Sequence, residues 1–275
     1  MSTSTTRPRS LILTVYGAHV RDLDGWIPIA DLIALMSGLG VDAQAVRSSV
    51  SRLKQKGMLL PEKCGGSMGY RLSDEAAARF DEGDTRVSRR SEPARLSDGW
   101  VLAIFSVPEV ERRQRHVLRS RLAWLGFGRT SSGVWIAPAY LLEDARVMLL
   151  RLGLSQYVHL FHADYLHFGD VRELVGKWWD LDTLQEMYGR FAATYEPVLG
   201  TWRERPAGDA EAFRDHVLAI TEWRRLPHLD PGLPPELLPA GWTGSRAGDV
   251  FRELTGLLGP AAARHVRDVA GGSGR

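Results

Sequence analysis

The 275-residue sequence predicts an α+β protein in which two mixed helix-and-strand parts precede a helical part. Within residues 41–72, an amphipathic helical pattern is followed by two strand-length segments joined by two glycines. Between residues 98 and 168, apolar segments of strand length alternate with helical patterns, and from residue 171 the apolar spacing is mostly helical. We therefore expect three domains, at residues 1–90, 98–168 and 171–275.

The helical pattern after Asp42 has one apolar face and one basic, hydrogen-bonding face. Asp42 is a good N-cap because its carboxylate can accept the free N–H groups of the first turn. Val46, Val50 and Leu53 recur at helical spacing and predict a buried stripe. No acidic residue occurs from 43 to 61, so the other faces suit DNA and its base edges. The side chains expected there are Gln44, Ser48, Ser51, Arg52 and Gln55 opposite the stripe, with Arg47, Lys54 and Lys56 on the flanks.

The segments around this helix complete a winged helix-turn-helix order. Pro8 can open a first helix, and residues 28–39 predict a second helix. Leu59-Leu60 and residues 70–72 predict a hairpin wing around the Gly65-Gly66 turn. A solvated surface helix could carry the same basic face without binding DNA, but the order of elements favours DNA binding. The side chains expected inside the second helix are Ile29, Leu32, Ile33 and Met36, and those expected on the DNA backbone are Lys54, Lys56, Lys63 and Arg71.

The central part predicts a ferredoxin-like βαββαβ domain. After a helix capped at Ser73 and a polar linker, residues 100–108 form an apolar segment of strand length. A helix over 110–125, two short strands around 131–133, a helix over 141–152 and a strand within 157–168 follow. Further helices are expected from residue 171, ending with one over about 246–258.

Composition and motifs indicate a soluble, cytoplasmic protein without catalytic or metal-binding residues. The formal net charge is +2, so a basic surface requires local segregation of charge. The single cysteine, Cys64, excludes an internal disulfide framework. No apolar run is long enough for a signal peptide or a membrane span. The sequence contains no dinucleotide fingerprint, Walker A motif or nucleophile elbow. His159, His162 and Asp164 suggest a metal site, but on a strand His159 and His162 point to opposite faces, so a plain strand is preferred.

Two clusters in the later part each have two interpretations. The arginines at 112, 113, 115, 119 and 121 form a solvated helix face or a docking surface for phosphates, which guanidinium groups bind well. The tryptophans at 178 and 179, with aromatic residues following at helical intervals, are core or the wall of an apolar ligand pocket. As a candidate effector site we name Arg112, Arg113, Arg115, Arg119, Trp178 and Trp179.

Seven segments of the chain resemble the PaaX family of bacterial transcriptional repressors, in the family's order. They are PRSLILTVYG, AVRSSVSRLKQKGML, GYRL, DGWVLAIFSVPE, LAWLGFGRTSSGVWIAP, KWWDLDTLQEMYGRF and LPHLDPGLPPELLP. The resemblance implies a winged helix, a ferredoxin-like domain and a helical C-terminal domain. It also implies a homodimer on a palindromic operator in double-stranded DNA, released by an acyl-coenzyme A such as phenylacetyl-coenzyme A.

Two other functions are kept as alternatives. The central domain resembles the CRISPR adaptation endonucleases, which carry an acidic residue at the end of their first strand. Here the strand ends Ile104-Phe105-Ser106-Val107, and the next carboxylate is Glu109. Because a catalytic metal needs hard oxygen ligands, this departure argues against a nuclease. The second alternative is a DNA-binding regulator that no small molecule controls.

Overall fold

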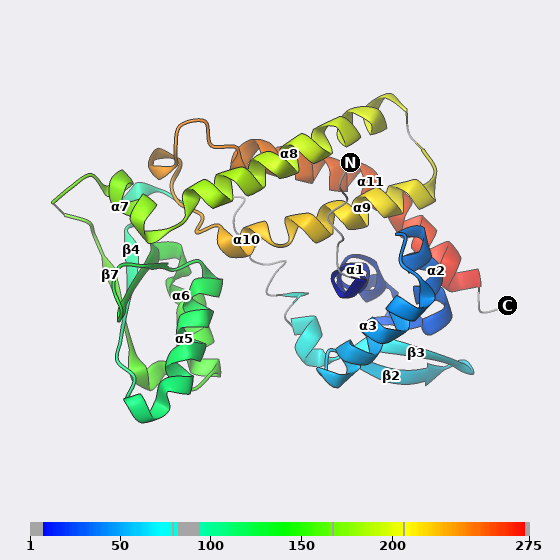
Figure 1. The fold of residues 1–275 in the computed structure, drawn as a ribbon, viewed down its shortest axis with the longest axis horizontal. Coiled ribbons are helices and arrows are strands. Elements are labelled where there is room, and N and C mark those ends of the chain that lie inside the picture. Colours follow the sequence, from blue (N-terminus) through cyan, green and yellow to red (C-terminus); the bar gives the residue numbers. More distant parts are fainter. Residues whose placement is uncertain (1–7, 79, 82–93, 167, 206, 273–275) are drawn as a thin grey trace. The chain divides into compact units, whose positions relative to one another are not determined.

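The computed structural model describes residues 8–78, 80–81, 94–166, 168–205 and 207–272 (Figure 1). It combines helices with two small antiparallel sheets. The chain groups into two compact units. The first contains residues 1–86, 191–223 and 246–275, and the second contains residues 87–190 and 224–245. Among the described residues, no helix is both long and apolar enough to span a membrane.

The first unit begins with three helices and a three-stranded sheet of order β1-β3-β2. A short π-helical turn, Tyr16–Val20, and a 3₁₀ turn, Arg21–Leu23, follow the first helix. The elements are α1 (Pro8–Val15), β1 (Trp26–Pro28), α2 (Ile29–Gly38), α3 (Ala43–Gln55), β2 (Leu59–Cys64) and β3 (Ser67–Leu72).

Local signals explain α3 and the hairpin after it. The Asp42 carboxylate accepts a hydrogen bond from the Ala45 N–H at 2.8 Å, which confirms the predicted N-cap. Strands β2 and β3 pair from Leu59 opposite Leu72 to Cys64 opposite Ser67. The turn residues Gly65 and Gly66 both have positive φ, as a two-residue hairpin turn of this hand requires. The predicted helix and hairpin are therefore both present.

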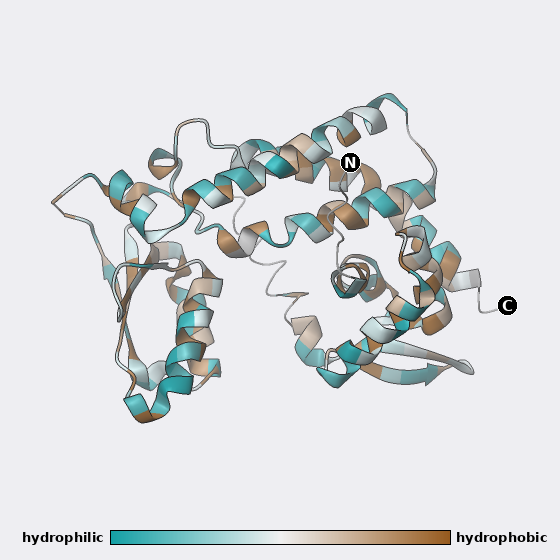
Figure 2. Ribbon diagram, viewed as in Figure 1, coloured by the Kyte–Doolittle hydropathy of each residue, from teal (hydrophilic) through white to brown (hydrophobic). Residues whose placement is uncertain are grey.

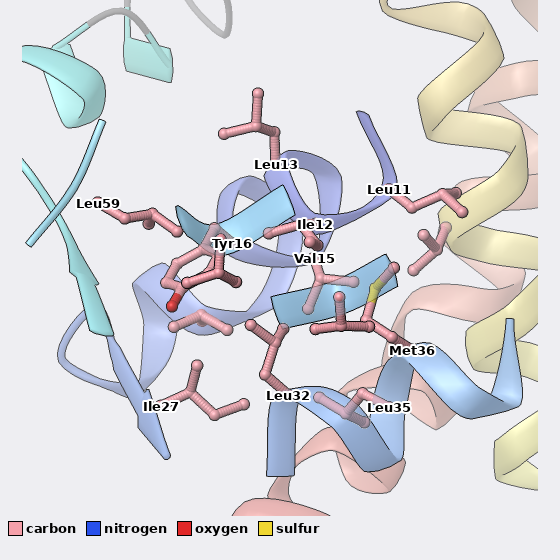
Figure 3. Close-up of a cluster of buried hydrophobic side chains, with 14 of the residues drawn as sticks. Leu11, Ile12, Leu13, Val15, Tyr16, Ile27, Leu32, Leu35, Met36 and Leu59 are labelled. Atoms are coloured by element: carbon pink, nitrogen blue, oxygen red, sulfur yellow. The ribbon is translucent and has the colours of Figure 1, made fainter. Parts of the chain in front are cut away.

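The core of the first unit combines the N-terminal helices with helices from the end of the chain. Figure 3 shows side chains of α1 and Tyr16 meeting Leu32, Leu35 and Met36 of α2. Phe213 and Val217 belong to the same cluster, as do two residues of the last helix, Ala262 and Val266. The later helices of this unit are the second half of α8 (Leu181–Glu204), α9 (Asp209–Trp223) and α11 (Gly244–Gly272).

Buried polar contacts also join α1 and its π-helical turn to α9. The Thr221 hydroxyl donates to the Thr14 hydroxyl at 2.8 Å. The His19 Nε2 lies 3.2 Å from the His216 Nδ1, and both rings are buried. Because buried polar groups cost free energy unless they are hydrogen-bonded, these contacts fix how α9 packs on α1.

The second unit contains the predicted β-α-β-β-α-β order and a four-stranded sheet of order β5-β6-β4-β7. Helices α5 and α6 cover one face of this sheet and bury Val101 and Ala103 with Leu118 and Leu122. The elements are β4 (Trp100–Phe105), α5 (Arg112–Leu125), β5 (Gly128–Arg129), β6 (Val134–Pro138), α6 (Leu142–Arg151) and β7 (Val158–Ala163). Helices α7 (Val171–Trp178) and α10 (Leu226–Leu229) and the first part of α8 belong to the same unit.

Several details differ from the prediction. Strand β1 was not expected. In α2, Leu35 is fully buried and Ile29 and Ile33 are only partly buried, so the apolar face is turned relative to the prediction. The last helix does not end near residue 258 but continues through Pro260 to Gly272. Residues of the predicted range 171–275 occur in both compact units; the three-domain division itself stays a prediction. The predicted linker covers residues 82–99, of which residues 82–93 lie outside the described residues.

Candidate nucleic-acid interface

Helix α3, with Lys56 directly after it, exposes each DNA-contacting side chain that was predicted for this segment. Val46, Val50 and Leu53 are buried, with at most 2% of each exposed, because they pack on the core of the first unit. Ser49 is buried beside them, and Ala45 is half-buried. Figure 2 shows the α3 ribbon changing between hydrophilic and hydrophobic residues, as an amphipathic helix does. The exposed residues are Gln44, Arg47, Ser48, Ser51, Arg52, Lys54, Gln55 and Lys56.

The exposed surface of α3 has an uncharged centre and two basic flanks. At about 100° per residue, the side chains opposite the buried stripe are Gln44, Ser48, Ser51 and Gln55. Arg47 lies about 70° to one side of their centre and Arg52 about 70° to the other. Lys54 continues the first flank and Lys56 the second. The prediction grouped Arg52 with the central side chains, but the helix geometry places Arg52 at the edge of that face.

A hollow of about 300 Å³ borders one of these flanks. Arg47, Ser51 and Lys54 line it from α3, at intervals of four and three residues. Ile29, at the start of α2, and Tyr70, on β3, line it from the other elements, and Val50 is the sixth lining residue. Sequence reasoning missed Ile29 and Tyr70 as parts of this surface, because only the packing of α2 and β3 brings them beside α3.

The cations of this surface differ in their ion pairing. Within the described part of the chain, no carboxylate forms an ion pair with Arg47, Arg52, Lys54, Lys56 or Lys63. Arg71 differs, because its Nε lies 3.0 Å from a carboxylate oxygen of Glu62. Glu62 is opposite Gly69 in the hairpin, so Arg71 is its diagonal neighbour across the strands. Arg71 is therefore partly neutralised within the hairpin, which the sequence could not show without the register.

The hairpin is fixed to the rest of the unit by Tyr16 and Trp26. The Tyr16 hydroxyl donates to the Tyr70 carbonyl at 3.0 Å, and burial raises the pKa of that hydroxyl, which keeps it protonated. The Trp26 Nε1–H donates to the Glu62 carbonyl at 3.2 Å. The Trp26 ring lies over Gly69, where a Cβ would approach it to 2.6 Å. Gly69 lies directly before the strand predicted at residues 70–72, and a glycine at a strand is the sequence signal for such a close approach.

The arginines of α5 do not share one face. Arg112, Arg113 and Arg119 are exposed, whereas Arg115 donates to the Val107 carbonyl at 2.7 Å and pairs with Glu109 at 3.0 Å. At about 100° per residue, Arg113 lies roughly opposite the buried stripe while Arg112 and Arg119 lie to one side. Of the four candidate effector arginines on this helix, three are therefore exposed, and Arg115 is held by Val107 and Glu109 of the same chain.

The two tryptophans of the candidate effector site differ in their packing. Trp179 is 8% exposed, belongs to a core cluster with Trp100 and donates from Nε1 to the Gly126 carbonyl at 2.9 Å. Trp178 packs edge-on against Trp179 at 5.9 Å between ring centroids and is only partly buried. Trp179 therefore has a structural role in the second unit, whether or not a ligand lies near it.

Of the residues that suggested a metal site in the sequence, His159 and His162 lie on β7 and Asp164 follows directly after it. The His162 Nε2 lies 2.9 Å from the Asp98 carbonyl oxygen. No group of three or more potential metal ligands occurs among the described residues. Strand β4 ends at Phe105, and the Glu109 carboxylate beyond it pairs with Arg115. This arrangement does not favour the nuclease alternative.

Comparisons with known proteins cover nearly the whole chain. Residues 7–76 match the family described as PaaX-like protein, residues 93–175 match the PaaX protein central Cas2-like domain, and residues 179–268 match the PaaX-like protein C-terminal domain. The chain is 29% identical over 267 residues to a protein named Transcriptional repressor PaaX from Escherichia coli (strain K12), covering 94% of this chain and 83% of the relative.

A solved structure has a similar fold. It is named Uncharacterized protein Rv0674 from Mycobacterium tuberculosis, and the match covers 96% of this chain and 100% of the other, with a TM-score of 0.62 and 22% identity. The three family matches and the Escherichia coli relative confirm the resemblance noted in the sequence. This chain belongs to the PaaX family of transcriptional repressors.

Proposed function

We propose that this chain represses transcription by binding double-stranded operator DNA through α3. In this proposal α1, α2, α3 and the β2–β3 hairpin act as a winged helix-turn-helix, and α3 enters the major groove. The observation that carries the proposal is the exposed surface of α3. Its centre offers amide and hydroxyl groups suited to base edges, and its two flanks offer cations that no described carboxylate neutralises.

Repression at a palindromic operator also requires a homodimer. Two copies related by a two-fold axis would place their α3 helices in major grooves about one turn of DNA apart. This step is supported by the family's resemblance to dimeric repressors, since no self-pairing element is evident in the sequence. Its measurable consequence is a stoichiometry of two chains for each operator.

The proposed effector is an acyl-coenzyme A thioester such as phenylacetyl-coenzyme A. The resemblance to the family supports this choice, and the exposed cations Arg112, Arg113 and Arg119 would contact its phosphates. Of the two tryptophans, Trp178 is more accessible to an aryl group than Trp179 in its core. Release from DNA requires the effector to bind the DNA-free state more tightly than the DNA-bound state.

The test is fluorescence anisotropy of the purified protein on labelled DNA from upstream of its own gene. Salt is held constant because phosphate contacts make the affinity depend steeply on salt. Phenylacetyl-coenzyme A, free coenzyme A and phenylacetate are added separately, and the expected result is release by the thioester alone. Tight binding that none of a panel of acyl-coenzyme A thioesters relieves would favour the alternative, a DNA-binding regulator without a small-molecule effector.

A substitution at the edge of the α3 face tests base contact. Arg52→Ala is expected to weaken operator binding by about 1–3 kcal/mol if the guanidinium contacts a guanine. Binding to a scrambled sequence should change much less. An unchanged affinity for the operator at the same salt concentration would remove Arg52 from the set of base-contacting residues.

A further inference from the structure

The hollow beside α3 combines a cationic wall with an apolar wall. Arg47 and Lys54 supply two positive charges, and Ser51 supplies a hydroxyl one turn from each. Ile29 of α2 and Tyr70 of β3 line the rest of the hollow together with Val50 and supply its apolar wall. A ligand that fits both walls carries a negative charge next to a compact apolar or weakly polar ring.

The sugar–phosphate backbone of DNA has this combination of groups. We propose that the hollow takes one deoxyribose–phosphate unit of the operator, with the phosphate on Arg47, Ser51 and Lys54 and the sugar against Ile29 and Tyr70. The inference rests on the proposed function and refines it. It assigns Arg47 and Ser51 to the backbone, where the sequence had left contact with bases or with nearby phosphates open.

We call this contact of the hollow with one deoxyribose–phosphate unit the backbone seat. Three observations support the seat over a base-contacting role for this flank. Arg47 and Lys54 lie to one side of the outward face, where a helix in a groove approaches a backbone strand. Neither has an ion-pair partner among the described residues, so both charges are free for phosphate. The hollow is also bounded by the hairpin strand β3 and by α2, so three elements fix its position relative to α3.

The seat makes a prediction that separates it from base contact. Neutralising one phosphate contact lowers the slope of log K against log salt by about 0.9 on B-form DNA, which corresponds to about an eightfold loss of affinity at 0.1 M salt. Because a phosphate carries no sequence information, the loss should be equal for operator and scrambled DNA. A base contact would instead change the ratio between the two.

The experiment measures the affinity for both DNAs at several salt concentrations. Arg47→Ala and Lys54→Ala are each expected to lower the slope by about 1 and to weaken both DNAs about eightfold. Ser51→Asp, which puts a negative charge into the seat at an exposed position, should weaken both DNAs at least as much. Tyr70→Phe keeps the ring and should stay within about twofold of wild type. Arg129→Ala removes an equal charge from an exposed site on β5 of the second unit and is the control, for which an unchanged salt slope and an unchanged affinity for both DNAs are expected.

The outcomes separate the seat from the proposed function. If wild type binds the operator but Arg47→Ala leaves the slope unchanged and alters the ratio between operator and scrambled DNA, the seat is wrong and DNA binding stands. If wild type binds no DNA at all, the proposed function fails and the seat fails with it. Coenzyme A also carries phosphates, so its binding heat is measured without DNA. Equal heats for wild type and Arg47→Ala support the seat, and a loss in Arg47→Ala would assign the hollow to the effector.

Discussion

Mild acid should destabilise the first unit through its buried histidine pair. His19 follows α1 and His216 lies on α9, and their ring nitrogens are 3.2 Å apart. Only 5% and 6% of the two side chains are exposed. Burial lowers the pKa of each imidazole to about 4, and for His216 the neighbouring His19 adds to the effect.

The expected loss of stability follows from the two protonation states. In the unfolded chain each histidine binds a proton below about pH 6.5, whereas in the folded chain it stays neutral down to about pH 4. The stability is therefore complete above pH 6.5 and falls as the pH decreases from 6.5 to 4. At pH 5 one such histidine lowers the free energy of unfolding by about 2 kcal/mol. Because the two rings contact each other, their losses are not independent, and we expect the pair to lower the free energy of unfolding by about 2–4 kcal/mol at pH 5.

Urea denaturation at pH 7, 6 and 5, followed by tryptophan fluorescence, measures this loss. The matched control is the double variant His19→Gln, His216→Gln, which keeps hydrogen-bonding side chains but cannot take up a proton. Between pH 7 and pH 5 the free energy of unfolding of wild type should fall by about 2–4 kcal/mol more than that of this control. If the control does not fold, NMR titration of the two imidazoles in wild type gives the same information. Native-state midpoints near 6.5 for both rings would refute the reasoning.

Three further changes test the packing of the first unit. Leu53→Ala removes a fully buried side chain from α3 and should lower the free energy of unfolding by about 2–5 kcal/mol, measured by urea denaturation. Gly69→Ala places a Cβ 2.6 Å from the Trp26 ring and should lower the melting temperature, while Gly38→Ala, which meets no atom within 4 Å, should not. A fragment of residues 1–90 lacks α9 and α11 from its core and should not unfold cooperatively in calorimetry; a sharp transition would show that these helices are dispensable.

Elements with strong local signals could be predicted from the sequence. The N-cap at Asp42, the stripe through Val50 and the Gly65-Gly66 turn each act over a few residues, so α3 and the hairpin follow from them directly. Strand β1 has only three residues and no alternating pattern, and its pairing with β3 depends on a distant segment. The ion pair between Arg71 and Glu62 likewise depends on the hairpin register.

In the last helix, tertiary packing outweighs a local sequence signal for the end of a helix. Gly259-Pro260 predicts a helix end, because proline removes one hydrogen bond and crowds the preceding turn. Yet α11 continues, with a buried stripe at every fourth residue on both sides of the proline. The residues of the stripe are Leu254, Leu258, Ala262 and Val266. Burial of the later half against the first unit compensates for the lost hydrogen bond, and no local pattern could have shown that this surface exists.

The shared core constrains how an effector could release DNA. Tyr16, at the end of α1, supports the hairpin, while Thr14 and His19 contact α9. The elements proposed to bind DNA and the C-terminal helices α9 and α11 thus form one close-packed body, and such interiors deform little without a discrete rearrangement. If an acyl-coenzyme A acts on this protein, we expect it to change the spacing between the two α3 helices of a dimer by moving whole first units, because distorting α3 alone would require breaking the core that holds it.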